Sequence, residues 1–247
     1  MKNLREFFPS RERILILSPH PDDDCIGMGA TINFLKKKDN IIKIFYLTPG
    51  WRGVKENLSC KERINLRKNE AISASKILGI DKKSLKFLFL PFYEKGKVVS
   101  EDIQKLTKEI KKFHPLVIFT SGEENDPHLT HKKCWKIIKE SLDGLDFFPK
   151  VYIYRVWKLL KKFDFYFPFG DEIMELKIEA IKAHRSQLEP KYIKKGMISF
   201  WEREESLNKF YGEVLRKKGK IRNFLFAEVF KSCPNNPEKN RGFRDEE

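Results

Sequence analysis

The amino-acid sequence predicts an α/β fold in which a mostly parallel sheet is flanked by helices on both faces. The first observation is that short apolar runs and longer amphipathic stretches alternate four times before residue 145. The second is that the connections between them are short, as in sheets wrapped by crossover helices. A chain of 247 residues is also long enough to bury one sizeable core. Such sheets bind ligands beyond the carboxyl ends of their strands, so a site is expected there.

The first third of the chain contains two strand–helix pairs. RILILS at residues 13–18 is short, apolar and followed by a proline-containing turn, which is typical of a buried strand. Residues 27–40 follow as a helix. Residues 41–50 form the next expected strand, which ends at its own Pro-Gly pair. The helix expected at residues 60–80 has apolar residues at helical spacing, and Gly79 is a suitable C-terminal stop.

Two further pairs continue the alternation. LKFLFLPF at residues 85–92 is the third expected strand. Residues 100–114 are expected to form a helix because acidic residues occupy its first turn, where they interact favourably with the helix dipole. PLVIFTS at residues 115–121 is the fourth strand, and a polar loop connects it to a helix at residues 131–144.

The pattern is less regular after residue 150. Residues 150–157 and 224–232 resemble strands, and residues 172–188 and 198–219 resemble helices. The aromatic run FDFYFPFG at residues 163–170 fits either the core or a surface that binds sugar rings.

One domain is expected across residues 1–247, because the sequence shows no internal repeat and no convincing linker. Its core is expected at about residues 13–190, followed by an irregular C-terminal part at residues 191–232. The polar residues 233–247 are expected to form a mobile tail.

The chain carries a formal net charge of +15, which points to nucleic acid, anionic membrane surfaces or acidic substrates as partners. The lysines are spread along the chain, so solvated helix faces explain most of the charge. The sequence shows no zinc-finger spacing, no aromatic RNA-binding motif and no single basic stripe. Nucleic-acid binding therefore remains only an alternative function.

The compartment is expected to be the cytoplasm. The four cysteines stand alone, without the paired spacing of a zinc site or a dense disulfide framework. The N-terminal residues lack the apolar core of a secretion signal. No apolar stretch is long enough to span a bilayer, so we expect no transmembrane segment.

The most unusual segment is SPHPDDD at residues 18–24, directly after the first expected strand. Its imidazole and three carboxylates include like charges that repel one another and are costly to desolvate. A bound cation would turn that repulsion into attraction. Capping of a helix N-terminus would explain one aspartate, but not the histidine and three acids together.

A second polar cluster, NDPHLTH at residues 125–131, follows the fourth expected strand. The expected topology brings both clusters to the same edge of the sheet. Histidine and carboxylate side chains are suitable metal ligands, and a hydrolytic zinc site commonly uses three of them. The two clusters together offer enough groups for three ligands, a base and an acid.

These motifs resemble those of the LmbE/PIG-L family of zinc-dependent N-acetylglucosaminyl deacetylases. PHPDDD is similar to the family's (A/S)HPDDE motif, and NDPHLTH is similar to its HPDH motif. The family pattern R-x-x-E-x-x-x-A-x-x-x-L-G is present as Arg67, Glu70, Ala74 and Leu78-Gly79, and AHRSQ at residues 183–187 is similar to its HxSQ element. The four elements occur in the family's order and cover about residues 13–190.

The resemblance implies a Rossmann-like fold, which agrees with the strand–helix alternation. It also implies that His20, Asp23 and His131 bind Zn²⁺, although Fe²⁺ would suit the same ligand types. Asp22 would be the general base, and His128 would stabilise the oxyanion or protonate the leaving amine.

Two residues depart from the family pattern. Asp24 replaces the usual glutamate and shortens the reach of that carboxylate. Thr130 replaces the aspartate that is thought to orient and charge the neighbouring histidine in the family. Because a hydroxyl does this less well, a metal-binding but catalytically silent relative is an alternative.

Three further residues are candidates for substrate binding. The resemblance makes Arg67 a candidate, although a surface pair with Glu70 would explain it equally well. Trp51 and Arg52 follow the second expected strand, at the edge where ligands bind. His184 lies on an expected helix with Gln187 nearby, and either a structural role or a role in supporting the site or binding substrate would explain it.

The leading hypothesis is a metal-dependent hydrolase that removes acetate from an N-acetylated amino-sugar conjugate. The net charge of +15 adds the expectation that this conjugate is anionic. Homologues of this kind often self-associate, so a homo-oligomer is also an expectation.

Overall fold

The computed structural model describes residues 1–8, 10–54, 57–91, 98–122, 126–188 and 198–233. Its centre is an eight-stranded sheet with the order β1-β7-β8-β6-β5-β2-β3-β4. The strands are β1 Lys2–Asn3, β2 Arg13–Ser18, β3 Ile41–Tyr46, β4 Leu85–Phe87, β5 Val117–Thr120, β6 Lys150–Tyr154, β7 Phe165–Phe169 and β8 Phe226–Cys233. The paired strands are parallel except at β8, which runs antiparallel to both β6 and β7. The predicted mostly parallel α/β sheet is confirmed.

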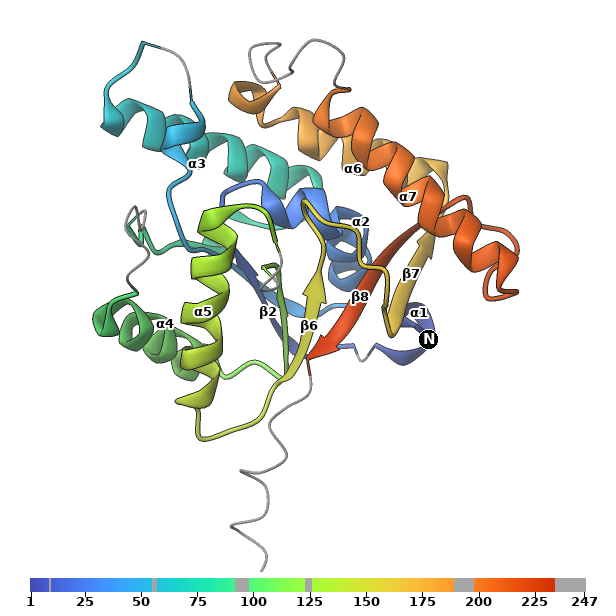
Figure 1. Ribbon diagram of the computed structural model, residues 1–247, viewed down its shortest axis with the longest axis horizontal. Helices are drawn as coiled ribbons and strands as arrows, with labels where there is room; N and C mark the ends of the chain where they lie inside the picture. Colours follow the sequence, from blue (N-terminus) through green and yellow to red (C-terminus); the bar gives the residue numbers. More distant parts are fainter. Residues whose placement is uncertain (9, 55–56, 92–97, 123–125, 189–197, 234–247) are drawn as a thin grey trace, which may run out of the picture.

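Helices cover both faces of this sheet, as Figure 1 shows. One face carries α4 Ser100–Phe113 and α5 Leu129–Asp143, and the other carries α2 Asp23–Lys37, α3 Cys60–Ile77 and α6 Asp171–Lys182. Helix α7 Phe200–Lys217 packs against β8 and α6. The remaining elements are α1 Leu4–Phe7 and the short turns η1 Trp51–Gly53, η2 Lys82–Ser84 and η3 Arg185–Gln187. None of the described helices is long and apolar enough to cross a bilayer.

Strand β2 shows why the sequence folds this way. Ile14 and Ile16 belong to the core under α2, α3 and α6, whereas Leu15 and Leu17 belong to the core under α4 and α5. Successive side chains of a strand point to opposite faces, so a central strand covered on both sides must be apolar at every position. The apolar run ILIL at residues 14–17 satisfies this requirement, and Arg13 at the start of the strand is exposed.

Several segments differ from the sequence-based expectations. The strand expected at residues 85–92 is confined to β4, because Phe89 has a φ of +51°, a left-handed conformation that ends the extended chain. The aromatic run at residues 163–170 contains β7, whose five residues are all buried, so the sugar-surface interpretation is wrong. Residues 2–7 form β1 and α1, which were not expected.

The C-terminal part contains regular elements, α7 and β8, within the range expected to be irregular. Of the expected mobile tail, Cys233 is the last residue of β8, and residues 234–247 lie outside the described residues.

A buried charge cluster ties β8 to helix α2. The backbone of α2 is non-helical at Met28, which leaves the next N–H groups without their usual helical acceptors. Glu228 of β8 accepts hydrogen bonds from the N–H groups of Ala30 and Thr31 at 3.0 and 2.8 Å. The ammonium of Lys177, itself fully buried, donates to Glu228 at 2.7 Å. This carboxylate therefore caps the second part of α2 from a distant strand.

Helix α7 makes a close backbone contact that predicts a large effect of a small substitution. A Cβ atom added to Gly212 would lie 1.9 Å from the carbonyl oxygen of Leu225, which is backbone and cannot rotate away. We expect Gly212→Ala to lower the free energy of unfolding by about 1–3 kcal/mol through overpacking. Urea unfolding measures this change. Gly170→Ala is the matched control, because an added Cβ there has no neighbour within 4 Å. Equal stability of the two variants would contradict the predicted contact.

Candidate active site

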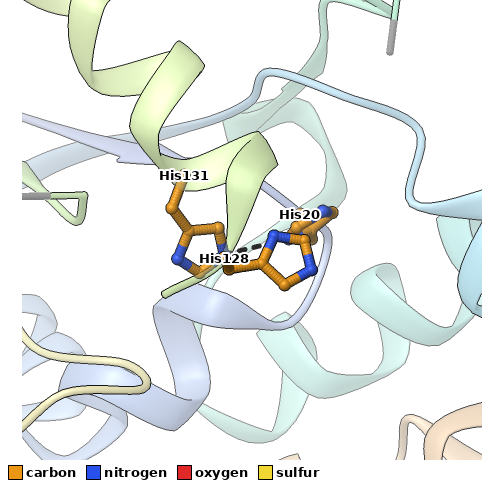
Figure 2. Close-up of side chains that lie close together, drawn as sticks. All are labelled: His20, His128 and His131. Atoms are coloured by element: carbon orange, nitrogen blue, oxygen red, sulfur yellow. Dashed lines mark hydrogen bonds between the residues drawn. The ribbon is translucent and has the colours of Figure 1, made fainter. Parts of the chain in front are cut away.

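The two polar clusters meet at the carboxyl edge of the sheet. Strands β2 and β5 are parallel neighbours with Leu17 opposite Thr120, so the segments that follow them emerge side by side. His20 follows β2, and His131 lies in the first turn of α5. Nδ1 of His20 and Nε2 of His131 are 3.1 Å apart. Figure 2 shows His20, His128 and His131 gathered in one place.

Hydrogen bonds within SPHPDDD fix the turn that presents His20. The hydroxyl of Ser18 donates to the carbonyl oxygen of His20 at 2.6 Å and accepts from the N–H of Asp24 at 3.2 Å. The N–H of His20 donates to Oδ2 of Asp23 at 2.8 Å. Helix α2 begins at Asp23, so its first turn contains two carboxylates, where the helix dipole favours negative charge.

Three side chains form a compact triangle of possible metal donors. Oδ2 of Asp23 lies 3.0 Å from Nδ1 of His20 and 3.1 Å from Nε2 of His131. The two imidazole nitrogens are themselves 3.1 Å apart. Three donor atoms converging from three residues is the arrangement that a divalent cation requires. Two wider donor groups share His20: one adds His128 and His131, and the other adds Asp22 and Asp23.

Asp126 supports the second cluster and was missed by the sequence analysis. Its Oδ2 lies 3.1 Å from Nδ1 of His131, and its Oδ1 accepts the N–H of His128 at 2.8 Å. A carboxylate on Nδ1 selects the tautomer that leaves Nε2 free to bind a metal. The signal in the sequence was an aspartate two residues before His128, the spacing at which its side chain accepts a local backbone N–H.

The electrostatics of the donor triangle favour a cation. Burial raises the pKa of Asp23, but the neighbouring His131 and His20 outweigh burial and hold that pKa well below its ordinary value. Burial lowers the pKa of His131, but the carboxylates of Asp23 and Asp126 together raise it to about 10. A positive charge between these two buried carboxylates is therefore stabilised, whether a proton or a metal carries it.

Asp22 lies beside the triangle and is held from α3. Nη2 of Arg67 pairs with Oδ2 of Asp22 at 3.0 Å, and Nη1 of Arg67 lies 4.0 Å from Glu70. Glu70 accepts the N–H and hydroxyl of Ser186 at 2.7 and 2.8 Å. The Arg67–Glu70 pattern and AHRSQ are thus parts of one network behind Asp22. Arg67 is only 2% exposed, so a pair on the helix surface is not its role.

His128 sits over the triangle as a neutral imidazole. Its ring is 4.8 Å from those of His20 and His131, measured between ring centres. Burial, aided by the two neighbouring histidines, lowers the pKa of His128 to about 4. Its Nδ1 is buried without a hydrogen-bond partner among the described residues. Thr130, which replaces the family's aspartate, lines a cavity together with His128.

Asp24, the other departure from the family motif, contacts different partners. It accepts a hydrogen bond from the hydroxyl of Tyr46 at 3.2 Å and lies 3.4 Å from the hydroxyl of Ser18. Burial raises the pKa of Asp24 to about 7. This carboxylate therefore supports the turn after β2 from inside the core.

A cavity of about 510 Å³ lies beside the donor triangle. The predicted residues His20, Asp22, Asp23, Arg52, Arg67 and His128 line it. His131 lies behind them, fully buried. Trp51, although it shares the turn η1 with Arg52, is not among the lining residues that the structure describes.

Trp157 lines the cavity and was not recognised from the sequence. Its ring is nearly parallel to that of His128, at 11° with 6.1 Å between centroids. The guanidinium of Arg203 lies 5.0 Å from the indole centroid, and the ring of Phe200 packs on it at 5.5 Å. The indole is therefore held in place while 37% of Trp157 remains exposed.

Residues 15–142, just over half of the chain, match the family model PIG-L, described as GlcNAc-PI de-N-acetylase. The chain belongs to the PIG-L family. The match includes both polar clusters and the Arg67–Glu70 pattern, so the family indicated by the sequence motifs is confirmed.

Three curated relatives of this PIG-L family protein share about a quarter of its residues. A glucosamine-6-phosphate deaminase-like protein of Bacteroides thetaiotaomicron is 26% identical, over 81% of the chain but 40% of the relative's own length. The "Probable N-acetyl-alpha-D-glucosaminyl L-malate deacetylase 2" of Bacillus subtilis is 25% identical, over 72% of the chain and 85% of the relative. The diacetylchitobiose deacetylase of Thermococcus kodakarensis is 26% identical, over 74% and 73%.

Solved structures show the same fold. The N,N'-diacetylchitobiose deacetylase of Pyrococcus horikoshii has a TM-score of 0.74 at 24% identity, covering 95% of this chain and 88% of that one. The hydratase GalB of Pseudomonas putida has a TM-score of 0.71 at 19% identity, covering 91% and 97%. Because the second is named for a different reaction, the fold alone does not determine the chemistry.

Proposed function

We propose that this PIG-L family protein is a metal-dependent hydrolase that removes acetate from an N-acetylated amino-sugar conjugate. The observation that supports it most directly is the meeting of three metal-donor atoms with a separate carboxylate, Asp22, at one cavity. Two relatives are named as deacetylases, one of glucosaminyl malate and one of diacetylchitobiose.

The residues that would hold the metal are His20, Asp23 and His131. The donor set fits Zn²⁺, with Fe²⁺ as an alternative, because two imidazole nitrogens and one carboxylate oxygen converge and are buried or half-buried. When bound, the metal lowers the pKa of a water molecule and polarises the acetamide carbonyl.

Asp22 is the proposed general base. Its carboxylate would take a proton from the attacking water, while Arg67 holds it in place at 3.0 Å. The N–H of neutral His128 would donate to the carbonyl oxygen as negative charge develops there. As the carbon–nitrogen bond breaks, Asp22 returns its proton to the leaving amine. His128 is not the proton donor in this proposal, because its lowered pKa keeps it neutral at pH 7.

Substrate would be bound by side chains that line the cavity. Arg67 lines it beside Asp22 and would place positive charge next to a polar group of the substrate. Arg52 and Lys133 also line the cavity and would attract an anionic group on the conjugate. The exposed indole of Trp157, another lining residue, offers a flat apolar surface to a sugar ring.

The test measures metal content and acetate release on the same samples of wild type and His131→Ala. The panel contains neutral, carboxylate-bearing and phosphate-bearing N-acetylglucosamine conjugates, each at low and high salt. His114→Asn is the control, because His114 ends α4 and stacks on Phe147 outside the site. Stoichiometric metal and acetate release in wild type and control, both lost in His131→Ala, would support the proposal. A salt-sensitive preference for charged conjugates would support the anionic substrate.

A second candidate is a family member that binds metal without turnover, which Thr130 favours because it cannot supply the family's carboxylate. Stoichiometric metal with no acetate from any conjugate would support this alternative. Wild-type protein that binds no metal after reconstitution would contradict both.

We expect Asp126→Asn to weaken metal binding by about 10- to 100-fold, because the amide no longer fixes the tautomer of His131. Competition with a chelator of known affinity measures the loss. Asp146→Asn is the control, since Asp146 is an exposed partner of Lys111. Unchanged metal affinity in Asp126→Asn would show that His131 is not a ligand oriented by Asp126.

A further inference from the structure

His184 is a buried histidine with two unused hydrogen-bonding atoms. It follows α6, and its backbone is fixed by a hydrogen bond from its N–H to Ile181 at 3.1 Å. The residue is only 2% exposed. Neither Nδ1 nor Nε2 has a hydrogen-bond partner among the described residues. Leaving a buried polar group unsatisfied destabilises the folded state, so a hydrogen-bond partner is expected for this imidazole.

The imidazole borders a small cavity that it shares with Asp22. The cavity has a volume of about 10 Å³, and its other walls are mostly apolar: Ile26, Ile181, Leu188 and Phe200, with Gln187 at one side. A space of this size holds about one water molecule when polar partners are present. It is too small for a sugar or an acetamide group. Among the described residues of its wall, Asp22 and His184 are the two with ionisable side chains.

Among the described residues, the Asp22 carboxylate forms one ion pair, between its Oδ2 and Arg67 at 3.0 Å. Ile26 and Phe200, which line the small cavity with Asp22, have apolar side chains that offer it no hydrogen bond. The network that holds Arg67 also holds His184, because Ser186, two residues later, donates twice to Glu70. The position of the imidazole relative to Asp22 is therefore fixed through η3 and α3.

The charge state of His184 suits a donor role. Burial is the main cause that lowers the pKa of His184 to about 4, although Asp22 opposes this effect. The imidazole is therefore neutral at pH 7, with one N–H to donate.

We propose that His184 is a positioning residue for Asp22, acting through one water molecule in the cavity between them. The imidazole N–H donates to the water, and the water donates to the Asp22 carboxylate. The two contacts, Arg67 on one side and this water on the other, hold the carboxylate in the orientation that accepts a proton. This inference rests on the proposed function of Asp22 as the general base.

The test compares three substitutions of His184 with one control. His184→Leu fills the position without a donor. His184→Asn and His184→Gln place an amide near the Nδ1 and Nε2 positions respectively. Ile181→Val is the control, because it changes the packing of the same cavity without removing a polar group. The measurements are kcat, KM, metal content and the midpoint of thermal unfolding.

We expect His184→Leu to lower kcat by about 10- to 100-fold, with KM within about twofold and metal content unchanged. At least one of the two amide variants should recover most of kcat, and the control should stay within about twofold of wild type. His184→Leu should also melt below the control, because the water loses its partner. A merely structural histidine would give neither the kcat-against-KM split nor rescue by an amide.

The opposite result is equally clear. If no water joins the two groups, His184→Leu removes an unsatisfied polar group, so the variant should melt above wild type with full kcat. That outcome would overturn the inference. The melting comparison needs no substrate, so it tests the hydrogen-bonded cavity even if wild type releases no acetate and the proposed function fails.

Discussion

Replacing Asp22 with asparagine is expected to lower acetate release by about 100- to 10,000-fold while the bound metal is retained. Asparagine has the same size but cannot accept the proton of the attacking water. The metal should remain because His20, Asp23 and His131 are unchanged. The measurement is kcat beside metal content on one preparation, with thermal unfolding to show that Arg67 tolerates the loss of its charged partner.

Asp24→Asn is the matched control for this prediction. Asp24 is close in sequence and more deeply buried, with a pKa raised to about 7 by burial, so its neutral form is already well populated at neutral pH. We expect Asp24→Asn to keep most of the turnover. If Asp22→Asn lost the metal as well as activity, Asp22 would belong to the alternative donor group with His20 and Asp23. Full activity in Asp22→Asn would show that another group is the base.

Replacing Glu228 with leucine is expected to lower the free energy of unfolding by about 3–5 kcal/mol, the usual result of removing one partner of a buried ion pair. The substitution leaves the buried ammonium of Lys177 without the carboxylate 2.7 Å away. It also removes the acceptor of the Ala30 and Thr31 N–H groups beyond the kink in α2. Urea unfolding measures the effect. The data for wild type and variant are fitted with one common slope of the free energy of unfolding against urea concentration.

The double variant Glu228→Leu/Lys177→Met separates the two causes. Removing both charges should restore part of the lost stability, because the single variant leaves the Lys177 ammonium with Glu204, at 4.0 Å, as its nearest carboxylate and the double variant has no such ammonium. The part of the free energy of unfolding that is not restored measures the cost of leaving the Ala30 and Thr31 N–H groups without their acceptor. A loss below about 1 kcal/mol in the single variant would contradict the role assigned to Glu228.

Much of the site could be predicted from sequence because its main groups follow strands that must end at one edge. The two clusters are separated by about a hundred residues, yet parallel pairing of β2 and β5 brings them together without any further assumption. The turn after β2 is also local in sequence. It is closed by a hydrogen bond between Ser18 and His20, and both residues lie within the run SPHPDDD.

The remaining parts of the site depend on tertiary packing. Trp157 is positioned by Arg203 and Phe200, which lie more than 40 residues later and carry no recognisable spacing relative to it. Trp51 was predicted because it follows an expected strand, whereas Trp157 lies within the strand expected at residues 150–157. The short β4 had a similar cause: its apolar run continues in sequence, but the left-handed conformation of Phe89 ends it.

The place of β8 has a consequence for the order in which the chain folds during synthesis. This strand separates β6 from β7, and the one other strand that pairs with β7 in the described part of the chain is the two-residue β1. Once the ribosome has made residues 1–200, β2 to β6 can assemble into a sheet, because each of these strands pairs with another that is already present. The apolar run FYFPF of β7 cannot enter the sheet until residues 226–233 emerge. The nascent chain therefore exposes this apolar run until β8 is made, and we expect chaperones to bind there.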